Sequence, residues 1–233
     1  MAIVGIVGGL GPESTIDYYR RILEGWKQED PSSTPSIVID SLDVQRGLRL
    51  VEHDRPALVD YLLASLRRLA GAGADFAAMA ANTPHVVFDD LVARSPIPLV
   101  SIVEACAEEA RRRGLKRLGL LGTRFTMEGS FYPDVCARYG IAIVTPNAQE
   151  RLWLHERYVG QMLNGDFRDD TRQDVIALVG RLRYDEHIDG VILGGTELTI
   201  LLPASVVANL PALDTTALHV AAIVKRLWSN SRS

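Results

Sequence analysis

Cysteine is scarce in this sequence of 233 residues, which contains only Cys106 and Cys136. Two cysteines are too few for a disulfide framework, so the composition favours a reducing compartment, the cytoplasm. Long apolar runs are also lacking, because no stretch reaches the roughly 20 residues that a membrane-spanning helix needs. The first apolar run, Ile3 to Val7, has no basic flank and ends at Gly8. We therefore expect neither a signal peptide nor a membrane anchor.

The sequence has no excess of positive charge. Its 25 Lys and Arg residues face 29 Asp and Glu residues, which leaves a formal net charge of -4. Binding to nucleic acid or to an anionic membrane depends on a basic surface, so neither partner is expected. Hydrophobic residues make up 47% of the chain, enough to bury a core without covalent staples.

Short apolar runs alternate along the chain with longer segments of helical period. This alternation is typical of an α/β protein in which helices flank a mostly parallel sheet. The predicted strands are 3–7, 36–39, 76–80, 99–100, 117–121, 141–144, 190–193 and 212–213.

The two halves of the sequence match each other. The matching pairs 114 positions apart are Gly8 with Gly122, Asp75 with Asp189, and Ala81 with Gly195, and a fourth pair is displaced by one residue. A shared offset at separate places indicates an internal repeat. We predict two pseudo-symmetric α/β lobes with a cleft between them, the first formed by residues 1–97 plus 210–233 and the second by residues 98–209.

Four predicted strand ends carry the same kind of residues. Each joins a glycine or another small residue to Ser, Thr or Asn where a helix would begin, and they are segments 8–15, 81–85, 122–126 and 195–199. Backbone N–H groups and hydroxyls at a helix start suit a carboxylate or a phosphate. One such segment alone is typical of a capped helix, whereas four around one predicted cleft favour a ligand site.

A dinucleotide site is the competing interpretation of the first strand end, because residues 9–14 resemble the G-x-G-x-x-G fingerprint. Pro12 removes a backbone N–H there, and Asp40 lies 29 residues beyond Gly11, whereas the fingerprint places its acidic residue about 20 residues on. We therefore expect no NAD.

The same strand ends resemble a known family. The segments 8–15 (GGLGPEST), 82–85 (NTPH), 121–127 (LGTRFTM) and 194–197 (GGTE) are similar to the signature segments of the aspartate/glutamate racemase superfamily. The resemblance implies two pseudo-symmetric α/β lobes, a homodimer, no pyridoxal phosphate or other cofactor, no metal, and a small amino or carboxylic acid as ligand. The positions it implies for substrate binding are Gly9, Asn82, Thr83, Thr123, Thr196 and Arg46.

Both thiols of that family are replaced in this sequence. In the family one cysteine precedes the Asn-Thr segment and another precedes the Thr-Glu segment, and the matching positions here are Ala81 and Gly195. Racemisation needs one group to remove the α-proton and another to deliver a proton on the opposite face, and losing one such group typically costs about 10²- to 10⁴-fold. Cys106 and Cys136 lie on apolar stripes, which favours a place in the core.

Three other residues could carry chemistry. His85 could act as a general base or bond a helix end, and Glu197 could act as an acid/base group or as a carboxylate favoured by a helix start. Arg46 could pair with a distal substrate carboxylate or remain a solvated surface residue.

The leading hypothesis is a family member that binds a small amino or carboxylic acid and performs a one-sided proton transfer or an elimination through His85 or Glu197. The alternatives are a catalytically inactive pseudoenzyme that binds a ligand, and an inactivated mutant of a racemase. A decarboxylase-like activity that needs one thiol is disfavoured by Gly195.

Overall fold

The computed structural model describes residues 2–203 and 205–231, which divide into two compact units. The first unit takes in the chain up to Ser101 and again from His219, and the second runs from Ile102 to Leu218. Residues 98–101 thus lie in the first unit and residues 210–218 in the second, whereas the sequence predicted the reverse. Strand β4 (Leu99–Val100) pairs with the first sheet and strand β9 (Leu210–Asp214) with the second, and backbone hydrogen bonding decides these memberships.

The first unit is built on a four-stranded parallel sheet in the order β2-β1-β3-β4. Its other strands are β1 (Ile3–Gly8), β2 (Ser36–Ser41) and β3 (Phe76–Met79). Helix α1 (Pro12–Glu29) and the later part of α11 (Thr215–Ser231) share a buried apolar cluster with β1 and β3. Helix α3 (Arg55–Gly71) lies on the other face, where Leu69 packs against Gly5. Around the sheet also lie α2 (Val44–His53), the 3₁₀ turn η1 (Thr83–Val87) and α4 (Phe88–Arg94).

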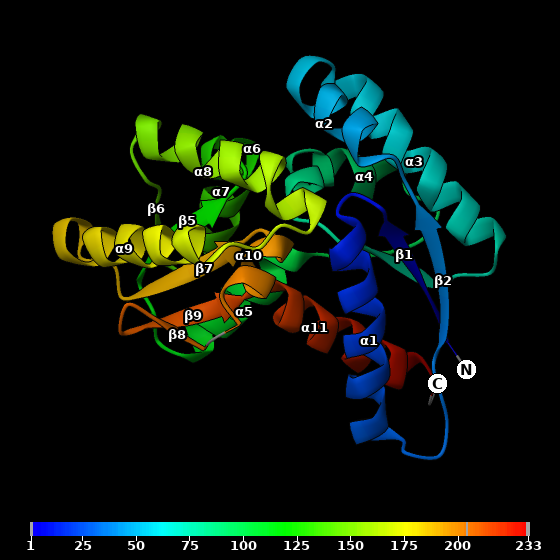
Figure 1. Ribbon diagram of the computed structural model, residues 1–233. Helices are drawn as coiled ribbons and strands as arrows, with labels where there is room; N and C mark the ends of the chain where they lie inside the picture. Colours follow the sequence, from blue (N-terminus) through cyan, green and yellow to red (C-terminus); the bar gives the residue numbers. More distant parts are fainter. Residues whose placement is uncertain (1, 204, 232–233) are drawn as a thin grey trace. The chain divides into compact units, whose positions relative to one another are not determined.

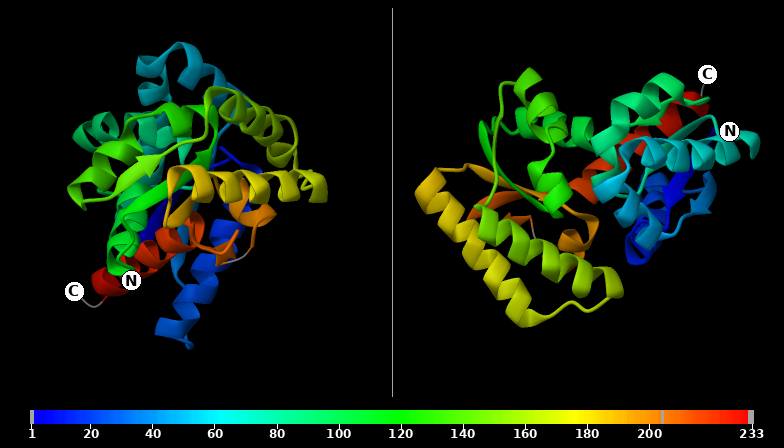
Figure 2. Two further views of the ribbon diagram at one scale, coloured as in Figure 1. Left: turned by 90° about the vertical axis from the view of Figure 1, so that its left-hand side faces the viewer. Right: turned by 90° about the horizontal axis from the view of Figure 1, so that it is seen from above.

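The second unit contains a five-stranded sheet in the order β6-β5-β7-β9-β8, antiparallel only between β9 and β8. Its remaining strands are β5 (Arg117–Gly122), β6 (Ala142–Val144), β7 (Gly190–Gly194) and β8 (Val206–Val207), of which the sequence did not predict β8. Helices α8 (Ala148–Gly160) and α9 (Asp169–Glu186) lie side by side, as both Figures 1 and 2 show. Helices α6 (Arg124–Glu128) and α10 (Thr196–Leu201) follow β5 and β7 directly, and the turn η2 (Met162–Asn164) follows α8.

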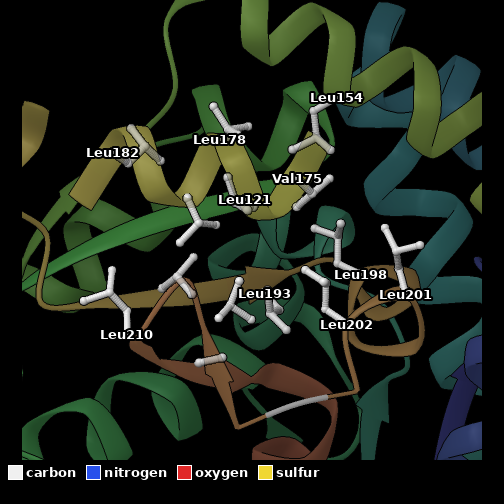
Figure 3. Packing of buried hydrophobic residues seen from close by; sticks show 14 of the residues in the cluster. Leu121, Leu154, Val175, Leu178, Leu182, Leu193, Leu198, Leu201, Leu202 and Leu210 are labelled. Atoms are coloured by element: carbon white, nitrogen blue, oxygen red, sulfur yellow. The ribbon is translucent and has the colours of Figure 1, made fainter. Parts of the chain in front are cut away.

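Alternating side chains of β5 place a core on each face of this sheet, because successive residues of a strand point to opposite sides. Leu118 and Leu120 pack with α5 (Ile102–Arg112) and α7 (Phe131–Arg138), whereas Leu121 packs with α8 and α9. Figure 3 shows the second of these cores, where leucines of α8, α9, β5, β7 and α10 point toward one another.

The internal repeat is present in the pairing of the strands. Val4 pairs with Phe76 in the first sheet and Leu118 pairs with Gly190 in the second, so both partners are displaced by 114 positions. The parallel strands also follow one another in the same order, which is β2-β1-β3-β4 in the first sheet and β6-β5-β7-β9 in the second. The predicted α/β class with two mostly parallel sheets flanked by helices is therefore confirmed.

None of the helices within residues 2–203 and 205–231 is both long enough and apolar enough to cross a membrane. Over the same residues, His, Cys, Asp and Glu side chains form no group of three or more that could hold a metal ion.

Gly9 occupies the tightest turn of the first unit. Its φ of 77° lies in the region that favours glycine, and a Cβ there would lie 2.2 Å from the carbonyl oxygen of Leu42. Backbone strain and overpacking each cost about 1–3 kcal/mol, so we expect Gly9→Ala to lower the free energy of unfolding by about 3 kcal/mol in urea titrations. Gly71→Ala is the control, because its Cβ would meet nothing within 4 Å. A Gly9→Ala protein as stable as this control would contradict the prediction.

Candidate functional site

The end of β7 carries the most unusual packing among the predicted strand ends. Gly195 has an ordinary extended backbone, with φ −151°, and begins α10. A Cβ at this position would lie 2.4 Å from Cε2 of Tyr158 and 2.8 Å from its hydroxyl oxygen. The tip of this tyrosine, which comes from α8, therefore fills the space of a side chain at position 195.

Tyr158 and Glu197 form a buried hydrogen-bonded pair beside Gly195. The Tyr158 hydroxyl donates a short hydrogen bond to Oε2 of Glu197, and the Thr196 hydroxyl donates to the same oxygen at 2.9 Å. Only 4% of Tyr158 and 1% of Glu197 are exposed. A carboxylate removed from water needs such donors, since burial without them is costly.

The pKa of Tyr158 is raised well above its ordinary value, first by burial and then by the nearby charge of Glu197. Both causes disfavour the phenolate. The hydroxyl therefore keeps its proton at neutral pH and serves as the donor in the hydrogen bond to the carboxylate.

Two threonines predicted to bind a substrate lie at one edge of the second sheet. Thr123 follows β5 and Thr196 follows β7, and the last residues of these strands, Gly122 and Gly194, are register partners. Both threonines are 3% exposed. The Thr123 hydroxyl accepts the backbone N–H of Thr126 at 3.2 Å and so caps α6. The parallel pairing thus places two threonines that are distant in the sequence just beyond the ends of neighbouring strands.

The corresponding strand end of the first unit contains His85. Its Nδ1 donates to the carbonyl oxygen of Ala81 at 3.1 Å, and its ring stacks on Phe88 with centroids 4.9 Å apart. Burial, together with the nearby His219, lowers the pKa of His85 to about 3. Asn82 is buried, and Thr83 is half-buried at the start of η1. His85 is thus neutral and stabilises the turn after β3, which corresponds to the second of its two predicted roles.

His219 and Tyr18 extend this buried cluster, and the sequence analysis identified neither. Nε2 of His219 donates to the carbonyl oxygen of Val100 at 3.0 Å, and Nδ1 accepts the Tyr18 hydroxyl at 2.9 Å. The His219 ring lies 6.3 Å from that of His85. Burial lowers the pKa of His219 to about 4. Both residues lie on apolar helix faces, where periodicity indicates core packing.

Two predicted binding residues of the first unit have other contacts. The backbone N–H of Gly9 donates to the Thr15 hydroxyl at 2.9 Å, inside the turn that follows β1. Arg46 is exposed on α2, and its guanidinium lies 4.6 Å from the centre of the Tyr61 ring. This is a cation–π contact on the surface, so the geometry within this unit corresponds to the solvated interpretation of Arg46.

The two cysteines are core residues, as their apolar stripes predicted. Cys106 and Cys136 are free and fully buried among the side chains of α5, α7 and β5. Burial raises the pKa of Cys106 and raises that of Cys136 to about 12. Neither provides a thiolate at neutral pH, which a base or nucleophile would need.

Comparisons with known proteins agree with this fold. The family model Asp/Glu/Hydantoin racemase matches residues 7–223. The broad specificity amino-acid racemase RacX of Bacillus subtilis (strain 168) is 25% identical over 225 residues, which cover 92% of this chain and 93% of the relative.

Two solved structures superpose over almost the whole chain. An Asp/Glu racemase candidate from Yersinia pestis has a TM-score of 0.86 and 31% identity, covering 97% of this chain and 99% of that one. An aspartate racemase homologue from Pyrococcus horikoshii OT3 has a TM-score of 0.80 and 32% identity, covering 98% of this chain and 100% of that one. The chain therefore belongs to the Asp/Glu/hydantoin racemase family, within the aspartate/glutamate racemase superfamily.

Proposed function

We propose that this protein binds a small amino or carboxylic acid and exchanges the proton on its α-carbon without a thiol, with the Glu197 carboxylate as the proton acceptor of the site. The observation that carries the proposal is the buried carboxylate of Glu197, two residues after Gly195, which two hydroxyls hold. The two hydroxyl donors fix the orientation of this carboxylate, and a positioned carboxylate can act as a general base. The family adds support, since RacX is named as an amino-acid racemase.

Glu197 is preferred to His85 for this role. The His85 ring is neutral, but its pKa of about 3 makes it a weak base, and its Nδ1 already donates to Ala81. The acid/base assignment of His85 is therefore dropped. Thr123 is proposed to hold the α-carboxylate of the ligand through its hydroxyl, and Thr196 through its backbone N–H at the start of α10, because donors beside the reacting carbon stabilise the charge that develops there. Asn82 and Thr83 stay predictions.

The proposed reaction is a one-sided proton transfer. The Cα–H bond breaks, the Glu197 carboxylate gains a proton, and the electron pair of the bond stays on Cα, delocalised into the carboxylate of the ligand. The proton exchanges with solvent and returns to the same face. Neither Ala81 nor Gly195 provides a second group for the opposite face, so configuration is retained.

The proposal predicts deuterium exchange at Cα. We expect the protein in D₂O to remove the α-proton NMR signal of one or more of the probes L-aspartate, L-glutamate, L-alanine and L-malate, without forming the D-enantiomer. Glu197→Gln, which keeps the shape of the side chain but removes its basicity, should slow this exchange by about 10²- to 10⁴-fold.

Each outcome of this experiment discriminates among the hypotheses. Exchange at the wild-type rate in Glu197→Gln would contradict the assigned role of that carboxylate. Formation of the D-enantiomer as fast as exchange would contradict the one-sided route. A probe that raises the thermal midpoint of the protein without exchanging would favour the inactive pseudoenzyme instead.

A further inference from the structure

We infer that the Tyr158 hydroxyl is the atom that takes the proton from Cα and that Glu197 accepts a proton from behind it. This relay rests on the proposed function and deepens it, because it names the group that touches the ligand. A hydroxyl held by a carboxylate would then perform the task that the family resemblance gives to a thiol.

The first argument is the place of the phenol. A side chain at position 195 and the tip of Tyr158 would occupy one volume, since a Cβ on Gly195 would lie 2.8 Å from the phenol oxygen. Position 195 is also where the family resemblance places the second cysteine. A hydroxyl from α8 therefore occupies the space in which the family resemblance expects an ionisable group.

The second argument is the set of hydrogen bonds around the phenol oxygen. It donates its proton to Oε2 of Glu197, and the backbone N–H of Glu197 points back to it at 3.4 Å. The Thr196 hydroxyl holds the same carboxylate oxygen at 2.9 Å. The phenol proton thus has an acceptor in place, and the N–H favours negative charge that develops on the phenol oxygen.

These contacts define a balanced proton relay. As the Cα–H bond breaks, its proton bonds to the phenol oxygen, and the original phenol proton passes to Oε2 of Glu197. The electron pair of the broken bond stays on Cα, the carboxylate becomes a carboxylic acid, and the phenol ends neutral. The reverse steps return a proton to Cα, so no oxidant, reductant or co-reactant is needed.

Packing alone is the competing explanation of Tyr158. A phenylalanine would fill the space beside Gly195 equally well, and it would not require a buried carboxylate opposite it. Burial of a carboxylate is unfavourable unless its partners compensate, so an arrangement that keeps both polar groups dry points to their use. The two explanations differ in the effect on Cα–H exchange that they predict when the Tyr158 phenol oxygen is removed.

The test compares two tyrosine–glutamate pairs of the second unit. We expect Tyr158→Phe to slow Cα–H exchange of the probe that the wild type exchanges by at least about 100-fold. Tyr139→Phe is the matched control, because the Tyr139 hydroxyl likewise donates to a glutamate, Glu104, at 2.8 Å, but Tyr139 is only half-buried and follows the end of α7. It should change exchange by no more than about twofold. In a relay the double variant Tyr158→Phe/Glu197→Gln should be no slower than the slower single variant.

A fluorinated tyrosine at position 158 tests the same inference with the packing retained. Fluorine lowers the pKa of the phenol, so a relay through its oxygen predicts that the alkaline limb of the exchange rate moves to lower pH. An unchanged pH profile, or full exchange in Tyr158→Phe, would overturn the relay and leave the proposed function standing. No exchange of any probe by the wild type would overturn the proposed function and the relay with it.

Discussion

Acidification from about pH 7.5 to about pH 4.5 is expected to lower the free energy of unfolding by about 5 kcal/mol through His85 and His219. In the folded protein their pKa values are about 3 and about 4, against 6.5 for an unperturbed histidine. At a pH between the folded and unfolded pKa values, both histidines are protonated in the unfolded chain but neutral in the folded protein. The stability that the two neutral rings contribute is therefore fully present above pH 6.5 and is lost as the pH falls. At pH 4.5 each ring accounts for about half of the expected loss.

Variants of the two rings separate this effect from the titration of carboxylates. His85→Asn keeps a donor near the position of Nδ1, and His219→Gln keeps one near that of Nε2. We expect each variant to lose about 2.5 kcal/mol of the difference between urea titrations at the two pH values. His53→Gln is the control, since the His53 side chain is 73% exposed. A pH dependence that is as steep in both variants as in the wild type and this control would contradict the prediction.

Restoring both thiols is expected to produce racemisation only after Tyr158 is shortened. In Ala81→Cys/Gly195→Cys the new Cβ at position 195 would lie 2.4 Å from a ring carbon of Tyr158, which cannot yield without losing its bond to Glu197. Addition of Tyr158→Ala opens the space for the thiol. The triple variant should then form the D-enantiomer of an exchanged probe at least about 100-fold faster than the double variant, because two acid/base groups are present again. Chiral chromatography of the products measures this.

A cysteine placed elsewhere controls for the mere addition of a thiol. Gly160→Cys at the end of α8 introduces one where a Cβ would meet nothing within 4 Å, and it should produce no racemisation. Gly195→Cys alone should lower the free energy of unfolding by about 1–3 kcal/mol, the usual effect of overpacking. Fast racemisation by the double variant with Tyr158 intact would show that the ring does not obstruct position 195.

The predicted strands follow from patterns that are local in the chain. The runs beginning at Ile3, Ser36, Phe76 and Arg117 form strands because apolar and β-branched residues there are bounded by glycine or polar turns. The repeat identified the equivalent strands of the two halves. Gly8 and Gly122 end β1 and β5, and these strands pair in the same way with β3 and β7. Strand β8 was missed, because two residues carry no periodicity.

The sequence by itself determined the α/β class, the internal repeat and the family resemblance, and it predicted that Ala81 and Gly195 stand where the resemblance expects thiols. Only the tertiary structure decided that Tyr158 fills the space beside Gly195, that His219 lies beside His85, and that β4 and β9 belong to the first and second sheets. The physical reason is the range of each interaction. Periodicity and capping act between residues a few positions apart, whereas these contacts join distant segments that meet only when strands pair and helices pack.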